Sequence, residues 1–210
     1  MKVMKGSYLD KNKALKEDFY LQETEIVAKN LINKILVRIL PDYPEPLAAR
    51  IVETEAYLDS GDKASHSAPG QTKRNAPMFA KGGILYVYKI YGIHHCVNVV
   101  TKEEGFGSAV LLRAGEPLSG IEKMKEHRSC GDIMKLCKGP GNLARSFGFD
   151  LSDNYSKLTG DDLYITDKGN IDDSMIGCSE RVGISKSEEF PLRFFLIGSN
   201  YVSSNKIKKL

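Results

Sequence analysis

Two strongly β-prone runs, residues 84–90 and 93–101, are separated in the sequence only by Tyr91-Gly92. So short a connection joins antiparallel neighbours, because two parallel strands need a crossover of about a dozen residues or more between them. A glycine in the second turn position is typical of a tight β-hairpin. We therefore expect a hairpin that carries Tyr91 at its tip, within a mainly antiparallel sheet.

Other β-prone runs supply the rest of that sheet. Residues 35–40 stop at Pro41, and residues 47–58 resume after the extended link that Pro44 and Pro46 impose. Further predicted strands lie at residues 108–113, 163–166 and 191–197.

Helical signals are fewer. Thr24 is a candidate N-cap of a helix that should end near Lys34. The apolar residues at helical spacing behind it are Ala28, Leu31, Ile32 and Ile35. Two more helices are expected, one at residues 121–126 and one after the glycine-proline turn at residues 138–143. Because helices and strands do not alternate regularly, we expect one α+β domain over residues 1–210, with a curved antiparallel sheet flanked by helices.

Composition narrows the class of protein. The 210 residues are 41% hydrophobic, enough for a sizeable core, and no run of about 18 apolar residues exists to span a bilayer. No secretory signal is visible, so we expect a cytoplasmic protein. Four cysteines without regular spacing predict reduced thiols. Neighbouring His94 and His95 point to opposite faces of a strand, and we expect neither a metal nor a cofactor.

Charge is only mildly informative. The net charge of +3 is compatible with a polyanionic partner without requiring one. Lys73, Arg74 and Lys81 stand in a stretch that has no acidic residue between positions 63 and 101, and Arg74 is a candidate contact to such a partner. A second basic group near the C-terminus consists of Lys206, Lys208 and Lys209.

The strand at residues 47–58 places two carboxylates on one surface. Its alternation puts Glu53, Glu55 and Tyr57 on the same face. Two such glutamates lie about 7 Å apart, as in an inverting glycosidase pair. Alternatively, one of them pairs with Arg50 or Arg113 and supports the sheet without reacting. The spacing alone leaves both interpretations open.

The longest stretch without periodicity is residues 59–83, which contain His66. A loop of this length inside a compact domain is usually functional or disordered, and we favour a functional loop. In the strand that follows, Tyr86 and Tyr88 share a face, which is typical of half-buried core tyrosines. Motifs of nucleotide-binding proteins, zinc proteases and serine hydrolases are not found in the sequence.

Several sequence blocks carry a resemblance to a known family. They read, in order, RIVETEAYLDSGDKASHS, QTKRNAPMFAKGGILYVYKIYGIHHCVNVV and AVLLRAGEPLSG, followed by CKGPGNLARSFGF and RVGISKSEEFPLRFFLIGS. Residues 50–120 in particular resemble the 3-methyladenine (alkyladenine) DNA glycosylase family of the mammalian type. The resemblance implies a single α+β domain that removes alkylated or deaminated purines from duplex DNA by cutting the N-glycosidic bond.

The resemblance also implies roles for individual residues. The catalytic glutamate of the family corresponds to Glu55, and its intercalating tyrosine corresponds to Tyr91. The residues implied to hold the substrate are the aromatic and polar groups Tyr57, His66, Tyr88, Asn98 and Arg113. Two segments depart from the family pattern. The loop KEEGF is longer and acidic at Glu103 and Glu104, and Asn142 stands where a basic residue would contact phosphate.

The chemistry of these residue types agrees with the implied roles. A base inside a duplex is unreachable, so the nucleotide must be flipped out and held between aromatic faces. A tyrosine at a hairpin tip can fill the gap, and a glutamate can activate a water without a lysine nucleophile. The expected partner is double-stranded DNA with damaged purines, bound by a monomer. The alternative is a non-catalytic nucleic-acid-binding domain that stacks bases on tyrosines, for which a carboxylate at Glu55 would be of no use.

Overall fold

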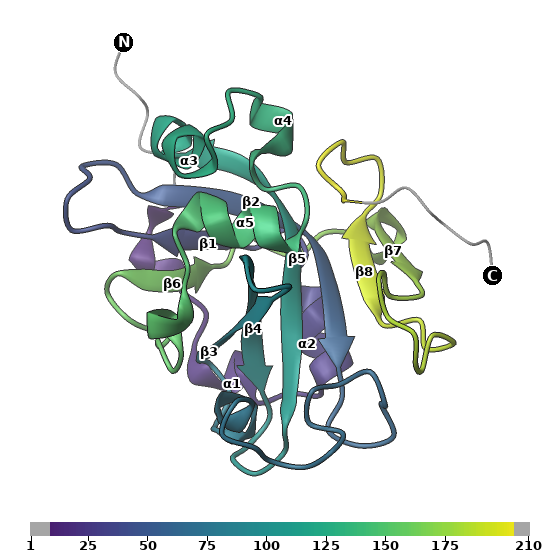
Figure 1. Ribbon diagram of the computed structural model, residues 1–210. Helices are drawn as coiled ribbons and strands as arrows, with labels where there is room; N and C mark the ends of the chain where they lie inside the picture. The colour runs from purple at the N-terminus through teal and green to yellow at the C-terminus, as the bar shows by residue number, and fades with distance from the viewer. Residues whose placement is uncertain (1–8, 204–210) are drawn as a thin grey trace.

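The computed structural model describes residues 9–203, and the strands within this range form one antiparallel sheet of eight strands (Figure 1). The order is β3-β4-β5-β2-β1-β6, and β8 pairs with both β2 and β7. The strands are β1 (Ile35–Arg38), β2 (Leu47–Tyr57), β3 (Leu85–Ile90), β4 (His94–Thr101), β5 (Ser108–Ser119), β6 (Leu163–Thr166), β7 (Ile176–Ser179) and β8 (Arg193–Leu196). The predicted α+β class with an antiparallel sheet is confirmed.

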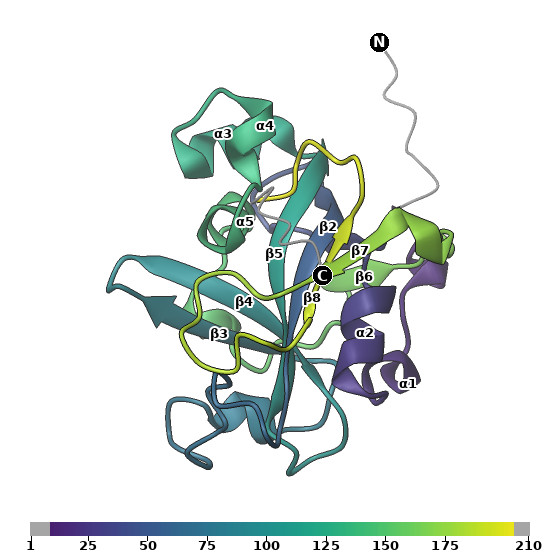
Figure 2. The ribbon, with the colours of Figure 1, turned by 90° about the vertical axis from the view of Figure 1, so that its right-hand side faces the viewer.

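Helices cover the sheet on both faces. Figure 1 shows α5 in front of β5 and α2 behind it, and the turned view in Figure 2 separates the two. The helices are α1 (Glu17–Tyr20), α2 (Thr24–Asn30), α3 (Ile121–Arg128), α4 (Ile133–Leu136) and α5 (Pro140–Phe147). Within residues 9–203, short 3-10 helices lie at Lys11–Lys13, Ala76–Phe79, Leu151–Asp153 and Asp173–Met175.

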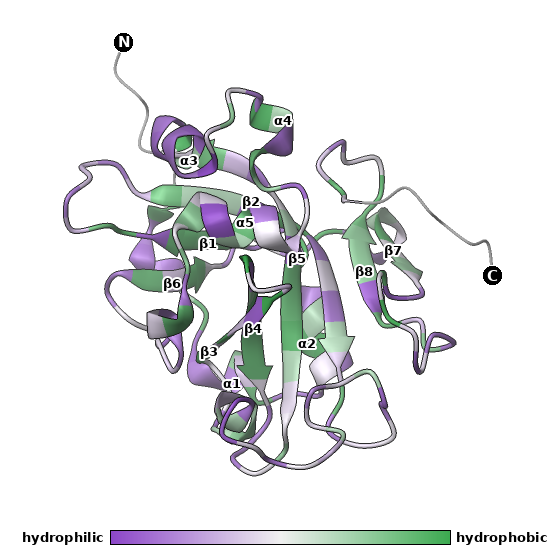
Figure 3. Ribbon diagram, viewed as in Figure 1, coloured by the Kyte–Doolittle hydropathy of each residue, from purple (hydrophilic) through white to green (hydrophobic). Residues whose placement is uncertain are grey.

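The sheet is organised around β2. This strand pairs with β5 along one edge, while its other edge is shared by β1 in the first half and β8 in the second. The register with β5 shifts on both sides of Glu53, between Ile51 and Glu53 and between Glu53 and Thr54. Figure 3 shows that β4 and β5 are mostly hydrophobic whereas α3 is largely hydrophilic on its outer side. The core therefore lies between the sheet and its helices, with β2 at its centre.

The predicted hairpin is present, but its turn is longer than expected. β3 and β4 pair up to Ile90 and His94, so the connection has three residues, and Ile93 belongs to the turn rather than to the strand. The β-branched Ile93 reads as strand in the sequence. The register pairs Ile90 with His94 and leaves Ile93 outside the strand pairing. Tyr91 (φ 51°) and Gly92 (φ 72°) are both left-handed, and the Ile93 N–H donates to the Ile90 carbonyl.

Other boundaries shift for local reasons. The helix predicted from Thr24 has Glu23 at its N-cap position, because the Thr24 hydroxyl is bonded to that of Thr101, and it ends at Asn30 rather than near Lys34. β5 continues to Ser119, past the predicted end at Arg113, because β2 is long enough to pair with it. β7 and α4 had no signal strong enough to predict them. The basic group at Lys206 to Lys209 lies outside the described residues.

Candidate active site

Glu55 is a buried carboxylate on β2 with a partner on each side. Its Oε2 accepts hydrogen bonds from the Tyr57 hydroxyl at 3.0 Å and from Arg113 Nη1 at 3.3 Å. Its Oε1 accepts the backbone N–H of Val182 at 2.7 Å. Burial raises the pKa of Glu55 above its ordinary value, and the Arg113 charge, the Val182 N–H and the Tyr57 hydroxyl offset this only in part. Such a carboxylate is a stronger base than an exposed one.

Glu53, two residues earlier, is buried as well but has more donors around it. Arg193 Nε donates to it at 2.8 Å and Arg113 Nε at 3.1 Å. The Ser203 N–H and hydroxyl add bonds of 2.6 and 2.9 Å. Burial, which raises the pKa of Glu53, is outweighed by Arg113, the Ser203 N–H and Arg193, so the pKa lies below its ordinary value. This carboxylate is held as an anion.

Arg113, on β5, links the two glutamates. Its Nε donates to Glu53 and its Nη1 to Glu55, while Nη2 reaches the Ser203 hydroxyl at 3.3 Å. Of the two pairings considered from the sequence, the one with Arg113 is observed. Arg50 instead forms an ion pair with Glu116. Glu53 and Glu55 therefore do not form two equivalent, free carboxylates.

A cavity of about 240 Å³ opens beside Glu55. It is lined by Tyr57, Ala64, His66, Arg74, Met78, Tyr88, Ile90, Asn98, Gly183 and Ile184. Five residues singled out in the sequence thus surround one space: Tyr57, His66, Arg74, Tyr88 and Asn98. Glu55 and Arg113 are not part of the lining, and Glu55 adjoins the cavity through its bond to the Tyr57 hydroxyl.

The aromatic side chains of the cavity hold each other in place. The His66 and Tyr88 rings meet edge to face, with centroids 4.5 Å apart. His66 Nδ1 also lies 3.0 Å from the Tyr86 hydroxyl. Burial lowers the pKa of His66, and the nearby charge of Arg74 adds to this, so the ring is neutral at neutral pH. The Asn98 amide is fixed by donating to the Tyr86 carbonyl at 3.0 Å.

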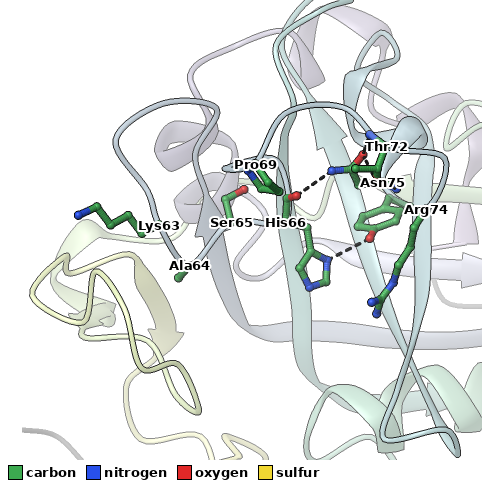
Figure 4. Close-up of a pocket in the computed structure, with 9 residues that line it drawn as sticks. Lys63, Ala64, Ser65, His66, Pro69, Thr72, Arg74 and Asn75 are labelled. Atoms are coloured by element: carbon green, nitrogen blue, oxygen red, sulfur yellow. Dashed lines mark hydrogen bonds between the residues drawn. The ribbon is translucent and has the colours of Figure 1, made fainter.

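The segment 59–83 delivers His66 and Arg74 to this region. Asn75 Nδ2 donates to the His66 carbonyl at 2.7 Å, and Asn75 Oδ1 accepts the Thr72 N–H at 2.6 Å, which ties the loop to itself. A second cavity of about 370 Å³ lies beside the first, and Figure 4 shows the His66 ring and the Arg74 side chain next to each other in it. The loop predicted from its lack of periodicity is thus ordered around the two cavities.

Sequence reasoning missed the residues that connect this loop to the segment after β7. Arg181 is buried, and its Nη1 and Nη2 donate to the two oxygens of Asp62 at 2.6 and 2.7 Å. Its guanidinium also lies 4.7 Å from the centroid of the Tyr57 ring. Arg181 precedes Val182, so this pair places the N–H that contacts Glu55. The only sequence signal is that RVG begins the last block of the family resemblance.

Tyr91 lies apart from the cavity. Its side chain is 85% exposed at the hairpin tip, next to Ile93, which is 72% exposed.

Among the described residues, no group of three or more His, Cys, Asp or Glu side chains has the arrangement of a metal site. Within residues 9–203 no helix has the length and apolar character needed to cross a membrane. The four cysteines are unpaired, as the sequence predicts.

Comparison with known proteins places the chain in a family. The model of the family described as Methylpurine-DNA glycosylase (MPG) matches residues 18–200. A protein of Chlorobaculum parvum named "Putative 3-methyladenine DNA glycosylase" is 43% identical over 195 residues, 93% of each chain. Proteins of the same name from Methanoculleus marisnigri (45%, covering 88% of this chain and 96% of that one) and Desulfitobacterium hafniense (41%, covering 91% and 98%) are also similar. The chain belongs to the methylpurine-DNA glycosylase family.

Proposed function

We propose that the protein is a monofunctional DNA glycosylase, which flips alkylated or deaminated purines out of duplex DNA and hydrolyses the N-glycosidic bond to begin base excision repair. The single observation that carries this proposal is a buried glutamate, Glu55, bonded to a tyrosine that lines an aromatic cavity. Membership of the methylpurine-DNA glycosylase family supports it. The relatives compared are bacterial and archaeal proteins.

The cavity suits a flipped purine. Tyr57, His66 and Tyr88 offer ring surfaces, and stacking on aromatic side chains is worth roughly 1–3 kcal/mol per base. Stacking tolerates many ring substituents, and a purine methylated at N3 or N7 carries a positive charge that aromatic faces attract. A neutral His66 does not repel such a cation. The Asn98 amide and Arg74 supply the few polar groups at the walls.

In the proposed reaction Glu55 acts as the general base. It orients a water and accepts its proton while the water oxygen bonds to C1′ and the bond from C1′ to the base nitrogen breaks. The base leaves with the electron pair of that bond. The negative charge of Glu55 also stabilises the cationic character that develops on the sugar. Burial serves this role because it raises the pKa of Glu55.

The residues around the cavity favour hydrolysis over a lyase reaction. A lyase step needs an amine nucleophile at C1′. None of the described residues that line the 240 Å³ cavity is a lysine. We therefore propose that the reaction ends with an abasic site and a free base.

The partner that we propose is double-stranded DNA containing a damaged purine, bound by a monomer in the cytoplasm. Tyr91 would fill the gap that the flipped nucleotide leaves in the base stack, since its exposed ring stands on a tight turn. Arg74, which lines the cavity mouth from the 59–83 segment, would contact the DNA backbone.

Gel analysis of abasic-site formation tests the proposal directly. Duplexes that each carry one lesion, 3-methyladenine, 7-methylguanine, hypoxanthine or ethenoadenine, are incubated with the protein, and abasic sites are cleaved with alkali. We expect base release from at least one duplex, and release about 10²–10⁴-fold slower with the Glu55→Gln variant. Tight lesion binding without release by the wild-type protein would instead support the non-catalytic nucleic-acid-binding domain.

A further inference from the structure

Glu53 and Glu55 share one cation but differ in every other partner. Arg113 donates from Nε to Glu53 at 3.1 Å and from Nη1 to Glu55 at 3.3 Å. Glu53 has a second cation of its own, Arg193 Nε at 2.8 Å, and the Ser203 N–H at 2.6 Å. The guanidinium of Arg113 is therefore divided between an anion that is already saturated and one that is not.

We propose that Glu53 is a positioning residue that holds Arg113 and limits how much of its charge reaches Glu55, so that Glu55 remains able to accept a proton. This inference rests on the proposed function of Glu55 as a base. Without Glu53, Arg113 would be free to pair with Glu55 through both of its terminal nitrogens, as arginine does with an isolated carboxylate. A carboxylate paired in that way is a poor base.

Arg193 completes the arrangement from β8. Because Arg193 also neutralises Glu53, Glu53 attracts Arg113 less strongly. Arg193 Nη1 in turn donates to the Ser179 hydroxyl at 3.0 Å. Ser203 connects Glu53 with the segment that follows β8. Removal of Glu53 and removal of Arg193 should therefore change Glu55 in opposite directions, because the first releases Arg113 towards Glu55 and the second draws it away.

Among residues 9–203, the other charged or titratable groups near Glu55 are few. From β2 itself they are Glu53 and Tyr57, and from β5 Arg113. Tyr88 on β3 and Cys96 on β4 also interact with Glu55, and Arg181 reaches it through Tyr57. Tyr88 and Cys96 have a raised pKa and stay neutral at the acidic pH where Glu55 titrates. The charges that decide the protonation of Glu55 are thus those of Glu53 and the arginines.

The test is the pH profile of single-turnover base release from 7-methylguanine duplexes, a lesion that is already cationic and needs no protonation to leave. In Glu53→Gln the acidic limb should move to lower pH by about 1 unit, and in Arg193→Gln it should move to higher pH by a similar amount. The matched control is Arg50→Gln, which breaks the other ion pair between β2 and β5 and should leave the limb unchanged.

Folding is checked by circular dichroism. If Glu53→Gln does not fold, the double variant Glu53→Gln/Arg193→Gln removes one charge of each sign. Because Arg193 acts on Glu55 through its bond to Glu53, its removal should add nothing once Glu53 is gone, and the limb should still move to lower pH. Unmoved limbs in the folded variants, or shifts in the same direction for Glu53→Gln and Arg193→Gln, would overturn the proposal and leave Glu53 a purely structural residue.

A readout without turnover separates this inference from the proposed function. The carboxyl carbon of Glu55 can be titrated by NMR in protein labelled at glutamate, with its signal assigned by its loss in Glu55→Gln. If the wild-type protein releases no base, the proposed function fails. The opposite shifts of the Glu55 titration in the two variants would still be measured, and their absence would reject the role of Glu53.

Discussion

Tyr88 and Tyr91 stand three residues apart on the same hairpin and have opposite surroundings. The Tyr88 ring is packed edge to face on His66 and lies 5.5 Å from the Tyr86 ring, inside the cavity wall. Tyr91 is 85% exposed, on a backbone with φ of 51°. The cavity wall, formed by Tyr57, His66 and Tyr88 among others, is thus built by contacts within the protein, whereas the ring of Tyr91 at the hairpin tip is exposed. Substitutions in the wall should therefore act on every substrate, and substitutions at the tip only where a duplex must be opened.

The largest loss of base release is expected at Glu55, which adjoins the cavity through its bond to Tyr57. Glu55→Gln keeps the shape of the side chain but cannot accept a proton, so base release should fall by about 10²–10⁴-fold while lesion binding is retained. Single-turnover kinetics and a gel-shift titration measure the two quantities. The rate should fall by the same factor on single-stranded and on duplex lesion DNA, as expected for a residue beside the cavity.

Glu53→Gln is the comparison for that variant. At neutral pH its loss of rate should be much smaller, because Glu53 is saturated by two arginines and Ser203. Equal losses in the two variants, both folded, would restore the interpretation of a reacting carboxylate pair.

Arg181→Met should be the next largest effect, on stability as well as rate. It leaves Asp62 buried without its guanidinium partner, and breaking a buried pair in this way costs about 3–5 kcal/mol. Urea unfolding measures the loss. The control is Lys29→Met, which breaks the exposed pair with Asp173 and should cost no more than about 1 kcal/mol. If Arg181→Met lowers the free energy of unfolding as little as Lys29→Met does, the pair of Arg181 with Asp62 does not stabilise the segment beside the cavity.

At the tip, Tyr91→Ser should weaken lesion binding and base release on duplex DNA by the equivalent of a few kcal/mol. The loss should shrink on single-stranded lesion DNA, where no base stack competes. The melting temperature should not change, since the side chain is exposed. A base-analogue fluorescence assay on both substrates makes the comparison.

Tyr91→Gly separates the ring from the backbone in that experiment. Glycine adopts a positive φ without strain, so this variant keeps or improves the turn while removing the ring. Both variants should lose activity alike on duplex DNA. If base release falls equally on single-stranded and duplex lesion DNA, Tyr91 acts like a residue of the cavity and does not fill a gap in the base stack.

His66→Phe, in the cavity wall, should change the rate of base release least. Phenylalanine keeps the ring surface against Tyr88 but loses the 3.0 Å contact of Nδ1 with the Tyr86 hydroxyl. If His66 only stacks, release of 7-methylguanine should fall by about tenfold at most, the worth of one hydrogen bond. A collapse of activity would show that the ring nitrogens bond to something essential.

Local patterns predicted only part of the cavity lining. Alternation along β2 predicted that Glu53, Glu55 and Tyr57 share a face, whereas the places of His66, Tyr88 and Asn98 in the site were implied by the family resemblance. The resemblance to the glycosylase family supplied the choice between the two glutamates, which spacing alone left open. Among the described residues, Glu53 has two arginine partners and Glu55 has one, and this difference supports our proposal that Glu55 is the base.

What the sequence did not predict depends on contacts between distant segments. Arg181 with Asp62, and Arg193 and Ser203 with Glu53, are separated by more than a hundred residues along the chain. The periodicity of the sequence does not predict such pairs. The length of the hairpin turn was missed because Ile93 has a strand-forming side chain, whereas the register pairs Ile90 with His94 and leaves Ile93 in the turn.

The position of β2 has a consequence for how the protein opens. The strand is hydrogen-bonded to β5 on one edge and to β1 and β8 on the other, so its amides can be released only when the sheet itself separates. Hydrogen exchange at Glu53, Glu55 and Tyr57 should therefore approach the rate of global unfolding. The amides of the hairpin tip should exchange orders of magnitude faster. In the proposed reaction, the strand that carries Glu55 is therefore assembled before the protein meets DNA.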